Sequence, residues 1–61
     1  MFTAESFGSD CPVNWEEIVA FLNNYCEDHE IDCEDREETD AVWEAYFRGE
    51  LPGAPKYIMS E

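Results

Sequence analysis

The sequence from Asn14 to Asp28 reads NWEEIVAFLNNYCED. Its apolar side chains recur every three or four positions, as they do along one face of an α-helix. They are Trp15, Ile18, Val19, Phe21, Leu22, Tyr25 and Cys26. Asn14 is a favoured N-cap residue, and Glu17 lies three positions later, as in a capping box. The stretch therefore predicts a helix over residues 15–28.

A second helix is predicted over residues 34–48. Asp35 and Glu38 repeat the capping-box spacing. The apolar stripe that follows consists of Val42, Trp43, Tyr46 and Phe47. Gly49 suits the position just after a helix, and Pro52 prevents the helix from continuing. Two helices with a short connection predict an antiparallel hairpin over residues 14–49.

Two extended arms flank this hairpin, at residues 1–13 and 50–61. A chain of 61 residues is long enough for a single small domain and no more. The arms offer a possible small two-stranded β pairing, but an isolated pair of strands is only marginally stable. We therefore expect a mainly α fold in which the arms pack on the hairpin. The predicted core is Trp15, Ile18, Leu22, Val42, Trp43 and Tyr46.

The acidic residues are the second conspicuous feature. The formal net charge is −13, and nine of the fourteen residues from 27 to 40 are acidic. Small soluble domains usually carry a net charge of magnitude about 2–8. If the run were mostly helical, it would carry roughly one charge per ~2.3 Å, close to the one per about 1.7 Å of duplex DNA. The candidate partner-binding residues are Glu27, Asp28, Glu30, Asp32, Glu34, Asp35, Glu37, Glu38, Asp40 and Glu44.

Such a charge repels nucleic acid and anionic membranes, so neither is expected to bind directly. It favours a basic nucleic-acid-binding protein or a nuclease complex as the partner. In size and charge, the chain resembles the small acidic inhibitors of phages and mobile elements, including DNA-mimic anti-restriction and anti-CRISPR proteins. That resemblance implies a protein that blocks the nucleic-acid channel of an enzyme in the cytoplasm of a bacterial host. The alternative for the run itself is a solvated surface without a partner.

The aromatic residues indicate a second possible function. Two helices cannot enclose all nine of them, so we expect some apolar surface to stay exposed, for instance at Phe2, Phe7 or Tyr57. Exposed apolar surface supports a homodimer or a partner interface. The alternative to an acidic inhibitor is therefore a small helical-hairpin adaptor or oligomerisation module.

Metal binding and catalysis are weaker hypotheses. Cys26, His29 and Cys33 offer three zinc-type ligands close together in the sequence. A carboxylate would have to complete that site, so we favour Cys26 in the core and the other two in a turn. One histidine near a cysteine also lacks an orienting group for nucleophilic catalysis. We expect neither a cofactor nor enzymatic activity.

The cysteines and the N-terminal residues bear on the compartment. The chain has three cysteines, Cys11, Cys26 and Cys33, which cannot all pair with one another. Residues 1–10 contain no basic residue and no long apolar run, so they do not resemble a signal peptide. We therefore expect free thiols in a reducing cytoplasm, and no segment that spans a bilayer.

Overall fold

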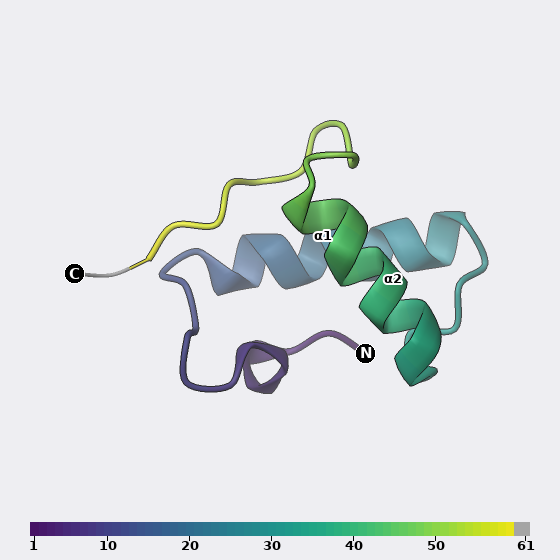
Figure 1. Cartoon of the computed structure of the whole chain (residues 1–61), viewed down its shortest axis with the longest axis horizontal. Coiled ribbons are helices and arrows are strands. Elements are labelled where there is room, and N and C mark those ends of the chain that lie inside the picture. The colour runs from purple at the N-terminus through teal and green to yellow at the C-terminus, as the bar shows by residue number, and fades with distance from the viewer. Residues whose placement is uncertain (60–61) are drawn as a thin grey trace.

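The structure, a computed structural model, describes residues 1–59 and contains three helical elements. These are the short 3₁₀ helix η1 (Ala4–Phe7), α1 (Trp15–Asp28) and α2 (Arg36–Phe47). The described residues form no strand, so the prediction of a mainly α hairpin with terminal arms is confirmed. Figure 1 shows α2 returning obliquely across α1, with the C-terminal arm passing back over the hairpin.

The helix boundaries follow the capping signals closely, with one shift. The helix α1 spans the predicted residues, whereas α2 begins two residues later than predicted and ends one residue earlier. The start is later because Asp35 is itself the N-cap, and its side chain accepts a hydrogen bond from the Glu37 amide at 2.9 Å. An N-cap residue lies outside the helix that it terminates.

Both helices end in a Schellman motif. At the end of α1 the Ile31 amide donates to the Cys26 carbonyl at 2.8 Å, and at the end of α2 the Glu50 amide donates to the Ala45 carbonyl at 3.0 Å. This motif requires a left-handed residue just after the helix. Gly49 fills that position after α2 with φ of 76°, whereas Glu30 fills it after α1 with φ of 55°.

Neither predicted capping box forms. At the start of α2 the Asp35 amide donates to the Asp32 carbonyl, and the Glu38 side chain accepts from the Asp32 amide instead.

At the start of α1 even the side-chain cap is missing. Asn14 occupies the N-cap position, but its side chain makes no capping hydrogen bond. Its Oδ1 instead accepts from the Ile58 amide at 3.2 Å, and its Nδ2 donates to the Lys56 carbonyl. The neighbouring Val13 amide donates to the Ile58 carbonyl at 2.8 Å. These contacts attach the C-terminal arm to the start of α1 without a β ladder.

A second asparagine attaches the N-terminal arm. The Asn23 Oδ1 accepts from the Phe2 amide at 2.9 Å, and its Nδ2 donates to the Phe2 carbonyl at 3.1 Å. This contact places the Phe2 ring in the core, where it is only 3% exposed. The expectation that Phe2 stays exposed is therefore wrong. The arm is also not fully extended, because it forms η1.

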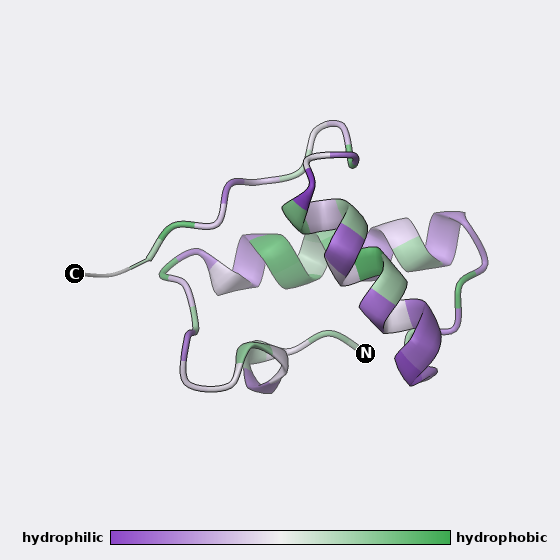
Figure 2. Cartoon of the chain, in the orientation of Figure 1, coloured by the Kyte–Doolittle hydropathy of each residue, from purple (hydrophilic) through white to green (hydrophobic). Residues whose placement is uncertain are grey.

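The core lies where the two helices cross. Its buried apolar residues are Phe2, Ile18, Val19, Leu22, Cys26, Val42, Tyr46 and Leu51. The predicted core residues Trp15 and Trp43 are only half-buried, whereas Phe2 and Leu51 from the arms are buried. Figure 2 shows apolar segments in the middle of α1 and hydrophilic residues at the start of α2.

Candidate functional site

The predicted acidic residues gather at the end of the hairpin where α1 leads into α2 (Figure 1). We call the nine acids between residues 27 and 40 the acidic end. Two lie in the last turn of α1, four lie between the helices, and three lie in the first turns of α2. All nine side chains are exposed, as is Glu44 farther along α2. The structure therefore brings nine of the ten predicted residues to one end of the molecule, whereas Glu44 lies in the last turn of α2 beside Arg48.

The acidic end is not the continuous charged row that a single helix would make. Only residues 27–28 and 36–40 of the run are helical. The Schellman motif after α1 reverses the chain, and the acids consequently surround a turn. The linear comparison with duplex DNA therefore does not apply. A polar run that contains no glycine gives little warning of such a reversal, because the left-handed position is occupied by Glu30.

Several of these carboxylates also hold the connection together. The Asp32 side chain accepts from the Glu34 amide at 3.0 Å, and the Glu38 side chain accepts from the Asp32 amide at 2.6 Å. With the Asp35 cap, three acids bind backbone donors between the two helices. Anions at the start of a helix also interact favourably with its dipole. Part of the acidity is therefore structural, a role for Asp32 that spacing alone did not indicate.

Two ion pairs occur among residues 1–59, one within α2 and one between α2 and the residue that follows it. Arg36 approaches Asp40 at 3.9 Å, and Arg48 approaches Glu44 at 2.5 Å. Both pairs join residues four positions apart, a spacing at which side chains of opposite charge face each other along a helix. Exposed pairs of this kind contribute about 0.3–0.5 kcal/mol each. Most of the acidic end thus has no neutralising partner within the described residues.

The alternative zinc ligands are not assembled. Within the described chain, no three His, Cys, Asp or Glu side chains are grouped to hold a metal ion. Cys26 is buried in the core, whereas the exposed His29 ring lies against Tyr25, with centroids 4.3 Å apart. All three cysteines are free thiols.

Burial also makes Cys26 a poor nucleophile. It raises the pKa of the Cys26 thiol above its ordinary value, and the neighbouring Cys33 and, more weakly, Glu38 raise it further, against a lowering by the N-terminal amino group. The reactive form of a cysteine is the thiolate. The pair of His29 and Cys26 consequently offers no activated nucleophile.

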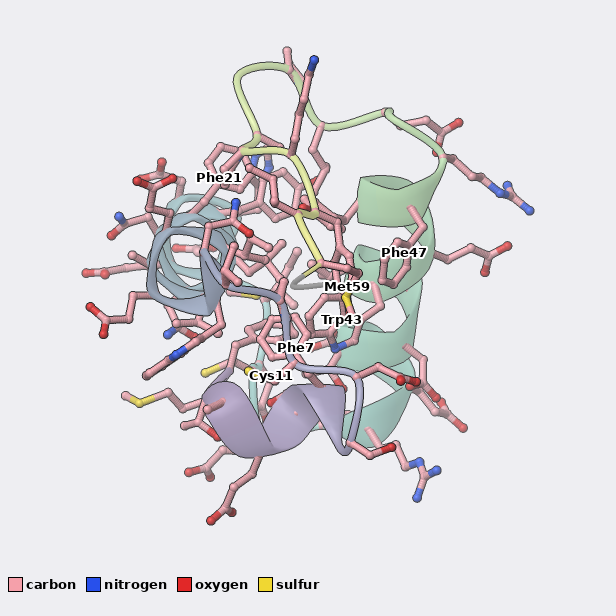
Figure 3. All side chains as sticks on the ribbon, turned by 90° about the vertical axis from the view of Figure 1, so that its left-hand side faces the viewer. Phe7, Cys11, Phe21, Trp43, Phe47 and Met59 are labelled. Carbon is pink, nitrogen blue, oxygen red and sulfur yellow. The ribbon has the colours of Figure 1, made fainter. Side chains whose placement is uncertain are left out.

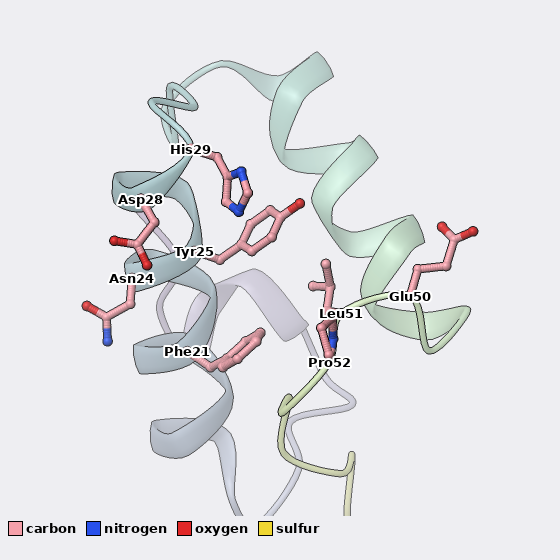
Figure 4. A pocket seen from close by; sticks show the side chains of 8 residues that line it. All are labelled: Phe21, Asn24, Tyr25, Asp28, His29, Glu50, Leu51 and Pro52. Atoms are coloured by element: carbon pink, nitrogen blue, oxygen red, sulfur yellow. The ribbon is translucent and has the colours of Figure 1, made fainter.

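A groove of about 420 Å³ lies beside the acidic end, between α1 and the segment after α2 (Figure 4). Phe21, Tyr25 and His29 form one wall, and Leu51 and Pro52 form the other. Asn24, Asp28 and Glu50 add polar groups to its lining. The groove is an apolar surface with acidic neighbours, and its lining contains no serine or cysteine.

Two further findings bear on the site. None of the helices in the described part of the chain is both long and apolar enough to cross a membrane. Comparison with protein-family models, with curated proteins and with solved structures finds no match to this chain.

Proposed function

We propose that this chain is a non-enzymatic acidic binding protein that docks its acidic end on the basic surface of a nucleic-acid-binding protein. The target would be an enzyme such as a nuclease complex, and the chain would inhibit it by occupying the surface that normally holds phosphates. It would act in this way as a nucleic-acid mimic of the anti-restriction or anti-CRISPR type, in the cytoplasm of a bacterial host.

One observation carries this proposal: the charge of the acidic end is exposed and one-sided. Its nine carboxylates are all exposed, and Arg36 is the one lysine or arginine between positions 27 and 40. A surface that served solubility alone would intersperse both signs of charge. Crowded like charges destabilise a compact domain. A basic partner would offset that repulsion and would also associate faster through electrostatic attraction.

The shape of the acidic end supports a concave target. The connection between the helices lies at one end of the molecule, away from the C-terminal arm (Figure 1). Charges around a protruding turn can enter a basic cleft, whereas a long straight row would be needed to follow an extended groove. We therefore infer a channel as the docking surface.

A second candidate is the helical-hairpin adaptor, which binds through apolar surface. Phe47, Ile58 and Met59 are large apolar side chains that stay exposed, and this observation favours it. The two functions respond oppositely to salt. Screening weakens contacts between exposed charges, whereas an apolar interface keeps its affinity as salt rises.

Competition with DNA tests the proposal. The protein is immobilised, proteins from the source cell are captured at low salt, and duplex DNA is added to elute them. Capture should depend on the acidic end, so the Glu34→Lys/Glu37→Lys variant should lose the same proteins that DNA elutes. The control variant Glu5→Lys/Glu16→Lys changes the net charge equally at exposed positions outside the acidic end.

The outcomes separate the candidates. The proposal is supported if the captured proteins bind nucleic acid and are eluted by DNA. The control variant should still capture them. Capture that survives both DNA and the acidic-end variant, but is lost in Phe47→Ala, contradicts it and supports the adaptor.

A further inference from the structure

Four aromatic side chains from three parts of the chain form a cluster on the surface. Phe7 comes from η1, Trp43 and Phe47 from α2, and Tyr57 from the C-terminal arm. Ring centroids are 5.0 Å apart for Phe7–Trp43, 5.6 Å for Trp43–Phe47, 5.6 Å for Phe47–Tyr57 and 5.9 Å for Tyr57–Phe7. The four contacts close a circuit, which we call the aromatic cluster. Figure 3 shows Phe7, Trp43 and Phe47 near one another on one side of the molecule.

A hollow of about 380 Å³ lies at the aromatic cluster. Its lining consists of the four rings together with Ser6, Asp10 and Asp40. This volume is within the range of small ligand sites. Asp10 follows η1 and Asp40 lies on α2, so two exposed carboxylates from separate elements border the same apolar surface. The hollow thus combines aromatic faces with negative charge.

The outer ring of the cluster is largely open. Phe47 is 61% exposed although it stacks on Trp43 with an interplanar angle of 17°. One exposed apolar residue is ordinary in a small protein. This one, however, extends a continuous aromatic surface beside two carboxylates. Two members of the cluster are tryptophan and tyrosine, residue types that are enriched at the energetic centres of protein interfaces.

Both carboxylates are available to an added cation. The ion pair of Asp40 with Arg36 is long, at 3.9 Å, and the Arg36 side chain is itself highly exposed. The Tyr57 hydroxyl donates a hydrogen bond to the backbone carbonyl of Asp10. The Asp10 carboxylate takes no part in that bond. The same bond holds the Tyr57 ring beside Asp10.

We propose that this hollow receives an arginine side chain of a protein partner. A guanidinium is planar and stacks on aromatic rings while its N–H groups bind carboxylates in pairs. A neutral apolar side chain would bury the carboxylates without a partner for them, which is unfavourable. A lysine ammonium can also bind carboxylates, but it is not planar and cannot stack on a ring face as a guanidinium does. The inference rests on the proposed function for the source of the arginine, because a basic partner supplies it.

NMR titration with two short capped peptides tests the assignment. The peptides differ only in a central arginine or lysine, flanked by glycines. The arginine peptide should shift the indole N–H signal of Trp43 saturably and bind about tenfold more tightly than the lysine peptide. Phe47→Leu keeps an apolar side chain but removes the ring face, and should abolish this preference.

A charge control accompanies the ring variant. Asp40→Asn should weaken binding of the arginine peptide severalfold, whereas Glu16→Gln removes one exposed carboxylate from α1 and should leave the affinity unchanged. Both substitutions are at exposed positions, so folding is preserved and is checked from the same spectra.

Several results would overturn the assignment. Equal affinities for the two peptides, or a Trp43 indole signal that does not move, exclude an arginine site. A third peptide, with trimethyllysine at the centre, is titrated in the same way, and tighter binding of that peptide assigns the hollow to methylated ammonium instead. Self-association in sedimentation that Phe47→Leu abolishes, with no peptide binding, assigns it to a second copy of the chain.

The failure of this inference is distinguishable from that of the proposed function. If capture of DNA-binding proteins depends on Glu34 and Glu37 but not on Phe47, the proposed function stands and the arginine site does not. If the arginine peptide binds as expected but neither salt nor DNA reduces the capture of partners, the arginine site is supported and the proposed acidic inhibitor is contradicted.

Discussion

The backbone conformation of one residue, Glu30, destabilises the folded state. A left-handed conformation, with φ of 55°, brings the Cβ of a non-glycine residue too close to the backbone, at a cost of roughly 1–2 kcal/mol. Gly49 occupies the equivalent position after α2 with φ of 76° and avoids that cost. The two helix ends are therefore matched in geometry and differ in residue.

We expect Glu30→Gly to stabilise the protein by about 0.5–1 kcal/mol, since glycine removes the strain but adds freedom to the unfolded chain. Urea unfolding measures the change. Glu30→Gln removes the same charge and keeps a side chain. The difference in unfolding free energy between the two variants therefore reports the effect of backbone conformation alone. A Glu30→Gly variant no more stable than Glu30→Gln would contradict the account of this turn.

Tyr46 links the core to the C-terminal arm. Its hydroxyl donates to the Pro55 carbonyl at 2.6 Å, and replacement by phenylalanine should cost about 1 kcal/mol at neutral pH. Burial, and to a lesser degree the nearby Tyr57, raises the pKa of Tyr46. Chemical denaturation of Tyr46→Phe checks the loss.

The same tyrosine predicts a dependence on alkaline pH. Above about pH 10 the unfolded chain releases the Tyr46 proton while the folded protein retains it. The stability of the native protein should therefore be intact below that pH and fall above it. Melting curves across this range should show a shallower fall for Tyr46→Phe, and an identical fall would remove Tyr46 as a cause.

At the scale of elements, the two residues predicted as helix N-caps, Asn14 and Asp35, make different contacts. Asp35 caps α2 through the Glu37 amide, whereas the Asn14 side chain holds the C-terminal arm. We expect Asn14→Ala to speed hydrogen exchange at the Ile58 amide without loosening the first turn of α1. Asp35→Ala should expose the Glu37 amide and destabilise the protein by about 1 kcal/mol. Faster hydrogen exchange at the first amides of α1 in Asn14→Ala would show that the Asn14 side chain caps the helix after all.

The elements also show what local sequence can and cannot predict. The apolar spacing in both helices, the Asp35 cap and Gly49 are local signals, and they placed the helices to within two residues. Which arm residue fills the core depends on contacts between distant positions, such as Phe2 with Asn23. The exposure of the acidic end followed from its polarity. The aromatic cluster did not, because Phe7 and Tyr57 meet only in the folded chain.

Repulsion among the charges of the whole molecule destabilises its folded state. With a net charge of −13, repulsion should weaken as added salt screens it, over a Debye length of about 10 Å at 0.1 M ionic strength. We therefore expect the melting temperature to rise with sodium chloride. Glu34→Lys/Glu37→Lys should also raise it, and the gain should shrink at high salt. A melting temperature that falls with salt would show that ion pairs outweigh the repulsion.

The salt dependence of the partner's Kd tests whether the acidic end binds a basic surface. Kd is measured by titration for a captured partner across a series of sodium chloride concentrations, for the native chain and for Glu34→Lys/Glu37→Lys. The account predicts that the native affinity falls steeply with salt, and that the variant binds more weakly with a shallower dependence. A native affinity that salt leaves unchanged, matched by the variant, would contradict it.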